Sequence, residues 1–277
     1  MKKVFNTIIF SLLIVLVVLI CLFPPYVIIV SSLQGQEEVF SVPARLIPKL
    51  LRLDNYIKVW SSMELAANIK NGLIVTFGTI IVTLIVSSLA AFPLARLKIP
   101  GKRLLMIGLL FTQMFAPAVL LVPLFKLFHQ LHLLNSLFGL IIVNTAFSLA
   151  FSTLLITSFF ETVPFEVVEA AIIDGCSKLK VLTKILLPIS SSGIMVVSIY
   201  IFTRVWNEFL FAFIFISSTD KYTPIVGLFN FIQVPGDQLP QWHLAMSASS
   251  ILTLPALLLF YFQRSSLSKG LISGAIK

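Results

Sequence analysis

The chain has 277 residues, of which 58% are hydrophobic and 11% are charged. Soluble domains carry about 25% charged residues, so this composition excludes an ordinary water-soluble domain and indicates a protein that lipid surrounds. The net charge of +9 would suit a nucleic-acid binder. Lys and Arg also gather at the cytoplasmic ends of membrane helices, however, and we expect no nucleic acid as a partner.

The first apolar segment follows Met1-Lys2-Lys3, as in a signal peptide. Its apolar run exceeds the usual core of about 7–15 residues and no Ala-x-Ala site follows it, so we expect an uncleaved first helix. In all, six apolar segments are long enough to cross a bilayer, which takes about 20 residues. These segments lie near 8–30, 73–95, 104–124, 137–159, 193–216 and 244–262.

Prolines interrupt two of these segments. The third carries Pro117 and Pro123, and the sixth carries Pro255. A proline inside a membrane helix frees a backbone carbonyl, so we expect kinks at these positions. No polar linker divides the chain. The sequence therefore predicts a single all-α, polytopic membrane domain of six transmembrane helices over residues 1–277.

The distribution of Lys and Arg predicts the orientation. Twelve of them fall in the N-terminus, the 96–103 loop, the 160–192 loop and the tail at 263–277, and seven fall on the opposite side, five of those in one long loop. The dense cluster is Arg96, Lys98, Lys102 and Arg103. Because positive residues favour cytoplasmic loops, we expect a multi-pass protein of the cell membrane with both termini in the cytoplasm.

The 160–192 loop has the most specific pattern in the chain. It reads Glu169-Ala170-Ala171, then Asp174-Gly175, and later Leu187-Pro188. Pro164 breaks the preceding helix, residues 165–174 suit a short helix, and Gly175 suits the left-handed turn that ends one. A second short helix with three lysines then leads to Pro188. On composition alone, a plain amphipathic helix at the membrane interface would also fit.

The register of the 160–192 loop resembles the cytoplasmic Glu-Ala-Ala loop of binding-protein-dependent ABC permeases, so we name it the coupling loop. Three further stretches resemble sugar-type permeases, in particular the second permease of maltose-type systems. They are Trp206-Asn207-Glu208-Phe209-Leu210, the 90–96 segment ending in Ala95-Arg96, and the tail with Phe262-Gln263-Arg264, Lys269-Gly270-Leu271 and Gly274-Ala275-Ile276-Lys277. Asn71-Gly72, where that family often has Asn-Ser, and Pro93 depart from the pattern.

This resemblance implies the fold of a type I ABC importer permease and the role of translocation subunit in an ATP-driven importer of a sugar, in particular an oligosaccharide. It implies four partners: a second, homologous permease that completes a heterodimer, two ATPase subunits and an extracytoplasmic solute-binding protein. The sequence has no Gly-x4-Gly-Lys-Ser/Thr phosphate loop. We therefore expect no enzyme activity and no cofactor on this chain, with ATP and Mg bound by the ATPase subunits.

The resemblance also implies roles for particular residues. Those expected to couple to the ATPase are Glu169, Ala170, Ala171, Asp174, Gly175, Leu187 and Pro188. Those expected to reach the ATPase from an extended, glycine-containing tail are Lys269, Gly270, Gly274 and Lys277, although a frayed terminus is the alternative. Those expected to contact the binding protein from the 217–243 loop are Gly227, Pro235, Gly236 and Asp237, although a re-entrant turn that caps the bundle is the alternative.

Arg204 and Glu208 are the only charges well inside a predicted span. They are four residues apart on one helical face, so they could pair. An unpaired charge at mid-membrane costs at least about 2.5–3.5 kcal/mol on insertion scales, so we expect both residues to face the bundle interior. Together with Asn207, they form the candidate pathway site. They would either line the solute pathway or form a structural ion pair.

Two other classes of function have weaker support. A self-sufficient secondary transporter would use Glu208 as a proton or sodium site, but no half-repeat of the sequence is evident. A membrane enzyme would need nucleophile or metal spacing that the sequence lacks. His129 and His132 have no supporting ligands for zinc, and Cys21 and Cys176 fall at different depths, so we expect neither a metal site nor a disulfide.

Overall fold

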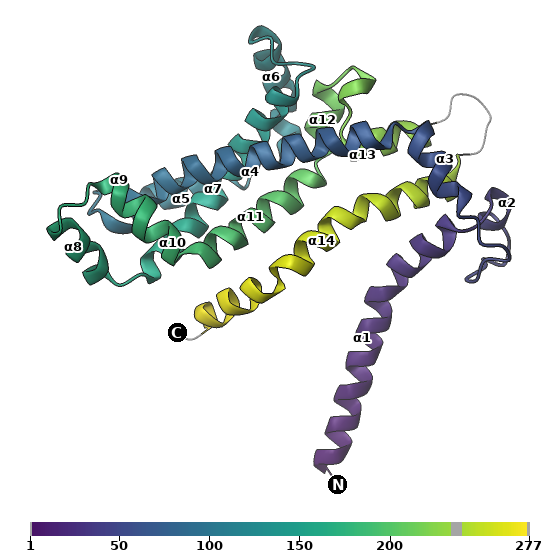
Figure 1. The fold of residues 1–277 in the computed structure, drawn as a ribbon, viewed down its shortest axis with the longest axis horizontal. Helices are drawn as coiled ribbons and strands as arrows, with labels where there is room; N and C mark the ends of the chain where they lie inside the picture. Colours follow the sequence, from purple (N-terminus) through teal and green to yellow (C-terminus); the bar gives the residue numbers. More distant parts are fainter. Residues whose placement is uncertain (1, 234–239, 276–277) are drawn as a thin grey trace. The chain divides into compact units, whose positions relative to one another are not determined.

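The computed structural model describes residues 2–233 and 240–275. Every regular element in those ranges is helical, as the all-α prediction requires (Figure 1). The principal helices are α1 Lys2–Ser32, α4 Leu65–Arg96, α5 Lys102–Thr112, α6 Pro117–Gln130, α7 Leu137–Thr162, α11 Ser191–Trp206 and α14 Trp242–Ala275. The shorter elements are α2 Gln36–Val39, α3 Asp54–Ser62, α8 Phe165–Ile173, α9 Lys178–Val181, η1 Leu182–Leu186, α10 Leu187–Ile189, α12 Leu210–Phe215, η2 Thr219–Lys221 and α13 Pro224–Ile232.

Four helices are long and apolar enough to cross a membrane, and they match the first, second, fourth and sixth predicted segments. They are Ile9–Ser32, Leu65–Arg96, Leu137–Thr162 and Trp242–Phe262. Two more spans arise if a bent pair of helices is counted as one, with bends of 90° between α5 and α6 and 81° between the 178–189 segment and α11. The described residues therefore support four to six spans.

One of the prolines expected to cause kinks lies next to a break between helices. The chain breaks between α5 and α6 directly before Pro117, which occupies the first turn of α6, where its missing N–H costs nothing. Pro123 and Pro255, in contrast, lie within helices that continue through them. The fifth predicted segment, 193–216, is not one helix either, because α11 ends at Trp206 and α12 begins at Leu210.

The helices form two compact units, of which the first comprises residues 1–66 and 227–254. Its centre is the C-terminal end of α1, where backbone carbonyls lack partners within the helix. The buried Asn55 of α3 donates from Nδ2 to the carbonyls of Ser32 and Gln34, both at 2.9 Å. The hydroxyl of Ser247 in α14 donates to the same Ser32 carbonyl at 3.0 Å. These bonds fasten α1, α3 and α14 together.

The second unit comprises residues 67–226 and 255–277. Its core is the contact between α7 and α11, where Ile156, Phe160, Val197 and Ile201 are fully buried. Gly193 makes this contact close, because a Cβ there would collide with the ring of Phe159. Within this unit, α8, α9 and α10 lie at one end of α7 and α11, and α6 and α12 lie at the other (Figure 1).

Candidate coupling loop and intramembrane site

Helix α8 and the turn after it form the first half of the coupling loop. Pro164 precedes the helix in an extended conformation, and Glu166 places an acidic group in the first turn, where the helix dipole favours it. At the other end, Gly175 has φ +82°, as predicted. Its N–H donates to the carbonyl of Ile172 at 3.0 Å, and the N–H of Cys176 donates to that of Ala171 at 2.9 Å. These are the two bonds of a Schellman motif.

The two faces of α8 differ sharply. Val168 and Ala171, three residues apart, are 3% and 7% exposed and join the hydrophobic core with α9. Glu169 and Ala170 are exposed, and so is Ile173, at 84%. Of the residues expected to couple to the ATPase, Ala171 therefore differs from Glu169 and Ala170, because its side chain is buried within its own chain. The exposed face offers a partner an acidic and apolar surface.

The second half of the coupling loop is one helical segment over residues 178–189. It starts at Ser177, whose hydroxyl accepts the N–H of Lys180. Its middle, Leu182–Leu186, is a π-helical turn directly before Leu187-Pro188. Pro188 has no N–H to donate to the carbonyl four residues back, so this is where the regular ladder is interrupted. Leu187 is half-buried against the core and Pro188 is exposed, so these two predicted coupling residues differ in what they can offer to a partner.

Arg96 fixes the base of the coupling loop, a role the sequence analysis did not assign. Its guanidinium Nη2, at the end of α4, donates to the carbonyls of Phe160 and Val163, the latter at 2.6 Å. A cation on the last carbonyls of a helix is favourable in charge and in hydrogen bonding. Lys102 of α5 adds an ion pair with Glu161 at 2.6 Å. The match of the 90–96 segment to sugar-type permeases was the sequence signal for Arg96.

Arg204 and Glu208 do not pair with each other. Among the described side chains, Arg204 instead donates from Nη1 to the hydroxyl of Ser148 at 2.8 Å and lies 5.8 Å from the centroid of the Phe147 ring. The carboxylate of Glu208 accepts two backbone N–H groups at the start of α12, at 2.7 and 3.0 Å. Both charged side chains are half-buried, and the ion pair considered from the sequence is not formed. Asn207 donates to the Thr203 carbonyl one turn back at 2.8 Å and is exposed.

At the opposite end of the second unit, two asparagines hold the connection that follows α12, residues 216–223, here called the outer connection. Asn71 of α4 donates from Nδ2 to the carbonyls of Asp220 and Tyr222 at 2.9 and 3.1 Å. Asn135, with φ +51°, accepts the N–H groups of Ser217 and Ser218 on Oδ1. Neither asparagine was predicted from the sequence to have this role.

A family described as binding-protein-dependent transport system inner membrane component matches residues 83–272, more than half of the chain. The chain belongs to this family. The matched residues include the coupling loop, Arg96 and the Arg204–Glu208 segment described above. Membership identifies the chain as the membrane-embedded permease component of an ABC importer and not an enzyme, with the ATPase on a separate subunit.

The relatives cover almost the whole permease. The inner membrane ABC transporter permease protein YcjP of Escherichia coli strain K12 is 31% identical, covering 95% of this chain and 93% of the relative. The trehalose/maltose transport system permease protein MalG of Thermococcus litoralis is 32% identical, covering 95% and 94%. The sulfoquinovosyl glycerol transport system permease protein SmoH of Agrobacterium fabrum is 32% identical, covering 92% and 89%.

A solved structure shows the same fold. It is a chain from the crystal structure of a bacterial ABC transporter involved in the import of the acidic polysaccharide alginate, with a TM-score of 0.81 over 94% of this chain and 95% of that chain, at 20% identity. The predicted type I ABC importer permease fold is confirmed. The permease is accordingly a multi-pass protein of the membrane, and an importer of this kind includes a partner permease, ATPases and a binding protein.

Two predicted groups of site residues remain. In the tail, Lys269, Gly270 and Gly274 lie in α14, which runs to Ala275, so the expected extended backbone is wrong and the segment is helical; Lys277 lies outside the described residues. Of the predicted binding-protein contacts, Gly227 is buried within α13. Pro235, Gly236 and Asp237 lie outside the described residues.

Among the described residues, no group of three or more His, Cys, Asp or Glu side chains is placed to hold a metal ion.

Proposed function

We propose that this permease forms, as a heterodimer with a second, homologous permease, the translocation pathway for a sugar, in particular an oligosaccharide. The observation that carries the proposal is the near-complete coverage by relatives whose names specify saccharide transport. Besides the trehalose/maltose and sulfoquinovosyl glycerol permeases, these include the diacetylchitobiose uptake system permease protein DasC of Streptomyces coelicolor, 28% identical over 92% of this chain. The substrate enters from an extracytoplasmic solute-binding protein, and both termini lie in the cytoplasm.

In this proposal the transporter contains two ATPase subunits, which bind ATP and Mg. The coupling loop of this permease receives the motion of one of them. The exposed face of α8, with Glu169, Ala170 and Ile173, docks into a cleft of one ATPase, and Asp174-Gly175 allows the chain to turn back sharply behind it. Val168 and Ala171 attach α8 to its own subunit, so a displacement of α8 is passed to the helices below it. Leu187 and Pro188 complete the attachment at the start of α11.

Cysteine cross-linking tests the docking face. In a background with Cys21 and Cys176 replaced by Ser, Ile173→Cys should cross-link to the ATPase subunit in the assembled transporter, because this side chain is 84% exposed. Phe138→Cys is the matched control, since Phe138 is 62% exposed but belongs to the first turn of α7, at the end remote from α8. Equal cross-linking of both variants, or of neither, contradicts the proposed docking face.

The proposal also assigns partners to the 217–243 loop and to the tail. Residues around 227–240, including Gly227, Pro235, Gly236 and Asp237, contact the binding protein as its lobes open. The tail with Lys269, Gly270, Gly274 and Lys277 contacts the ATPase, and it does so as a helix over the residues described. Shortening 233–239 should leave basal ATP hydrolysis intact and reduce its stimulation by loaded binding protein. Unchanged stimulation and uptake would instead identify the loop as a cap of the bundle.

Uptake by the reconstituted transporter tests the function as a whole. Proteoliposomes that contain this permease, its partner permease and the ATPase should accumulate a labelled saccharide only with ATP and the cognate binding protein. The binding protein identifies the sugar, since its ligands can be screened by a shift in its melting temperature. ATP-independent uptake driven by a proton or sodium gradient would overturn the assignment.

A further inference from the structure

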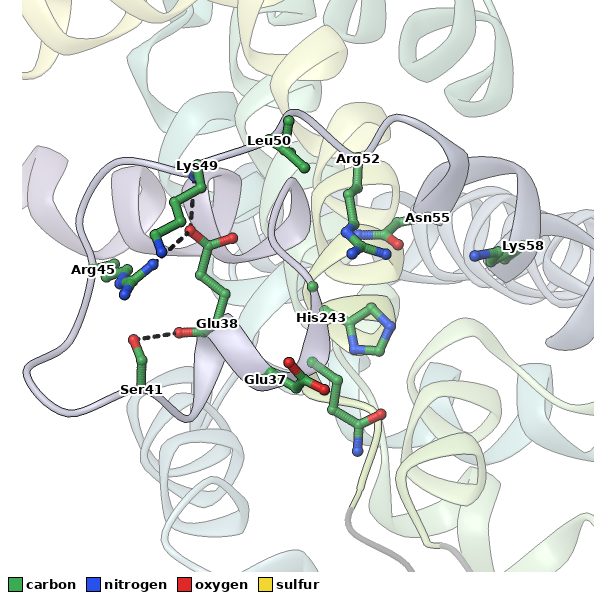
Figure 2. Close-up of a pocket in the computed structure, with 12 residues that line it drawn as sticks. Glu37, Glu38, Ser41, Arg45, Lys49, Leu50, Arg52, Asn55, Lys58 and His243 are labelled. Carbon is green, nitrogen blue, oxygen red and sulfur yellow. Dashed lines mark hydrogen bonds and ion pairs between the residues drawn. The ribbon is translucent and has the colours of Figure 1, made fainter.

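A polar cavity lies in the unit formed by residues 1–66 and 227–254. Its volume is about 540 Å³ (Figure 2). The elements around it are α2, the 40–53 loop, α3 and the first turn of α14. Its lining residues with charged or ionisable side chains are Glu37, Glu38, Arg45, Lys49, Arg52, Lys58 and His243. We call it the Arg52 cavity.

One wall of the Arg52 cavity is held by bonds within the chain. Glu38 accepts the backbone N–H of Lys49 at 2.7 Å and lies 3.9 Å from the guanidinium of Arg45, as Figure 2 shows. The hydroxyl of Ser41 donates to the carbonyl of Glu38 at 2.7 Å. These contacts order the 40–53 loop around α2, so the cavity is formed before anything binds in it.

Part of the positive charge around the cavity is already neutralised. Besides the Arg45–Glu38 contact, Lys58 donates to Asp54 at 2.6 Å, and this hydrogen bond lowers the pKa of Asp54 below its ordinary value. Among the described residues, the side chains of Lys49 and Arg52 have no ion-pair partner within 4 Å, although the charge of Arg52 also contributes to lowering the pKa of Asp54. The cavity therefore keeps a surplus of cationic hydrogen-bond donors.

Arg52 is placed so that its donors remain available. Its backbone N–H is bonded to the Leu33 carbonyl at 2.9 Å, which fixes the start of the side chain. The guanidinium lies against Gly35, where an added Cβ would be 3.1 Å from Nε and 3.2 Å from Cζ. Within the described residues the guanidinium has no hydrogen-bond acceptor. Nδ1 of His243, buried in the same cavity, also has no partner there.

We propose that the Arg52 cavity is a socket for an acidic side chain of the solute-binding protein. A free guanidinium fork takes a carboxylate in two parallel hydrogen bonds. The proposal rests on the proposed function and on the orientation in which the connection between α1 and α4, residues 33–64, faces outward. In that orientation the surplus positive charge is presented to the partner, where it steers docking and fixes its register. A carboxylate also gives the guanidinium of Arg52 the acceptor that the described part of the chain does not supply.

The test is the concentration of loaded binding protein that half-saturates ATP hydrolysis by the complete transporter in nanodiscs of neutral phosphatidylcholine. Arg52→Glu should raise this concentration at least tenfold with basal hydrolysis unchanged, and Arg52→Gln should raise it less and flatten its dependence on salt. Lys126→Glu, which makes the same change of charge at an exposed lysine outside the cavity, should have little effect. Neutralising acidic residues of the binding protein one at a time should then identify one whose effect disappears in the Arg52→Gln background.

Three outcomes overturn the proposal. Wild-type half-saturation in Arg52→Glu refutes the socket, as does an equal loss in Lys126→Glu, which would reflect only the overall charge. An effect of Arg52→Glu that appears only with anionic lipid in the nanodiscs assigns the cavity to a lipid headgroup instead. If loaded binding protein does not stimulate the wild-type transporter at all, the proposed function itself is contradicted. The failure of the socket and the failure of the proposed function can therefore be told apart.

Discussion

Replacing Gly175 with Val should uncouple ATP hydrolysis from transport while leaving the permease inserted in the membrane. Gly175 has φ +82°, and a Cβ added there would meet no atom within 4 Å. The penalty is therefore that of the backbone alone, about 1–2 kcal/mol for an ordinary L-residue in the left-handed region, with a β-branched residue at the upper end. This corresponds to a roughly 5–30-fold loss in the population of the native turn.

The loss of native structure in Gly175→Val should be confined to the coupling loop. The turn at Gly175 holds the end of α8 through the two Schellman bonds, and the buried residues of α7 and α11 lie outside it. In proteoliposomes with the ATPase and binding protein, we expect the number of sugar molecules transported per ATP to fall about fivefold or more in Gly175→Val. Membrane levels of the permease should match wild type on a quantitative blot.

Two further variants separate the local turn from strain in general. Gly175→Asn should retain most of the coupling, because Asn tolerates the left-handed region. Gly101→Val introduces the same kind of strain at φ +75°, again with no atom within 4 Å, but in the connection between α4 and α5. If Gly101→Val uncouples transport as strongly as Gly175→Val, or if Gly175→Val transports normally, the reasoning is wrong.

Three other substitutions test the contacts that position these segments. Arg96→Ala should destabilise the base of the coupling loop by about 1.5–3 kcal/mol, the usual contribution of hydrogen bonds to a charged group. Proteolysis of that loop should then be faster, and an unchanged cleavage rate argues against the role of Arg96. Asn71→Ala should raise hydrogen exchange in the outer connection, with exchange in the coupling loop as the internal control. In double-mutant cycles, the coupling energy between Arg204→Met and Ser148→Ala should be about 0.6–1.7 kcal/mol and larger than that between Arg204→Met and Glu208→Gln. A larger coupling energy in the Glu208 cycle would instead support an Arg204–Glu208 ion pair.

The parts of the fold that depend on continuous apolar length could be predicted from the sequence. Four spans agree because a run of about 20 apolar residues has few alternatives to a membrane helix. The fifth segment shows where this reasoning ends. Its hydropathy continues past Trp206, but the Glu208 carboxylate bonds the N–H groups of Phe211 and Ala212 and starts a new helix. Hydropathy does not register this competition between a side chain and the backbone.

The backbone conformation of the coupling loop could be predicted from the sequence, whereas the division of α8 into a buried and an exposed face was not predicted. Gly175 and Pro164 are local signals, and both ends of α8 agree with them. The burial of Ala171 follows from Val168 three residues earlier, a spacing that puts both on one helical face, so the sequence held this signal too. Arg96 is different, because its partners lie more than sixty residues away in the chain. Such a contact is set by tertiary packing, so the 90–96 segment could point to Arg96 only by its resemblance to sugar-type permeases and could not identify its partners.

The coupling loop is thus joined to a stiff pair of helices. α7 and α11 touch where Gly193 meets Phe159 and again where Arg204 meets Ser148. On α11 these two contacts are eleven residues apart, or about 16 Å at 1.5 Å per residue. In the proposed coupling, we expect a pair of helices held at both points to carry a displacement of α8 as far as the level of Arg204. The first interruption along α11 is the break at Asn207–Phe209, where Glu208 starts α12, and the change in backbone direction that transport requires is most easily taken up there.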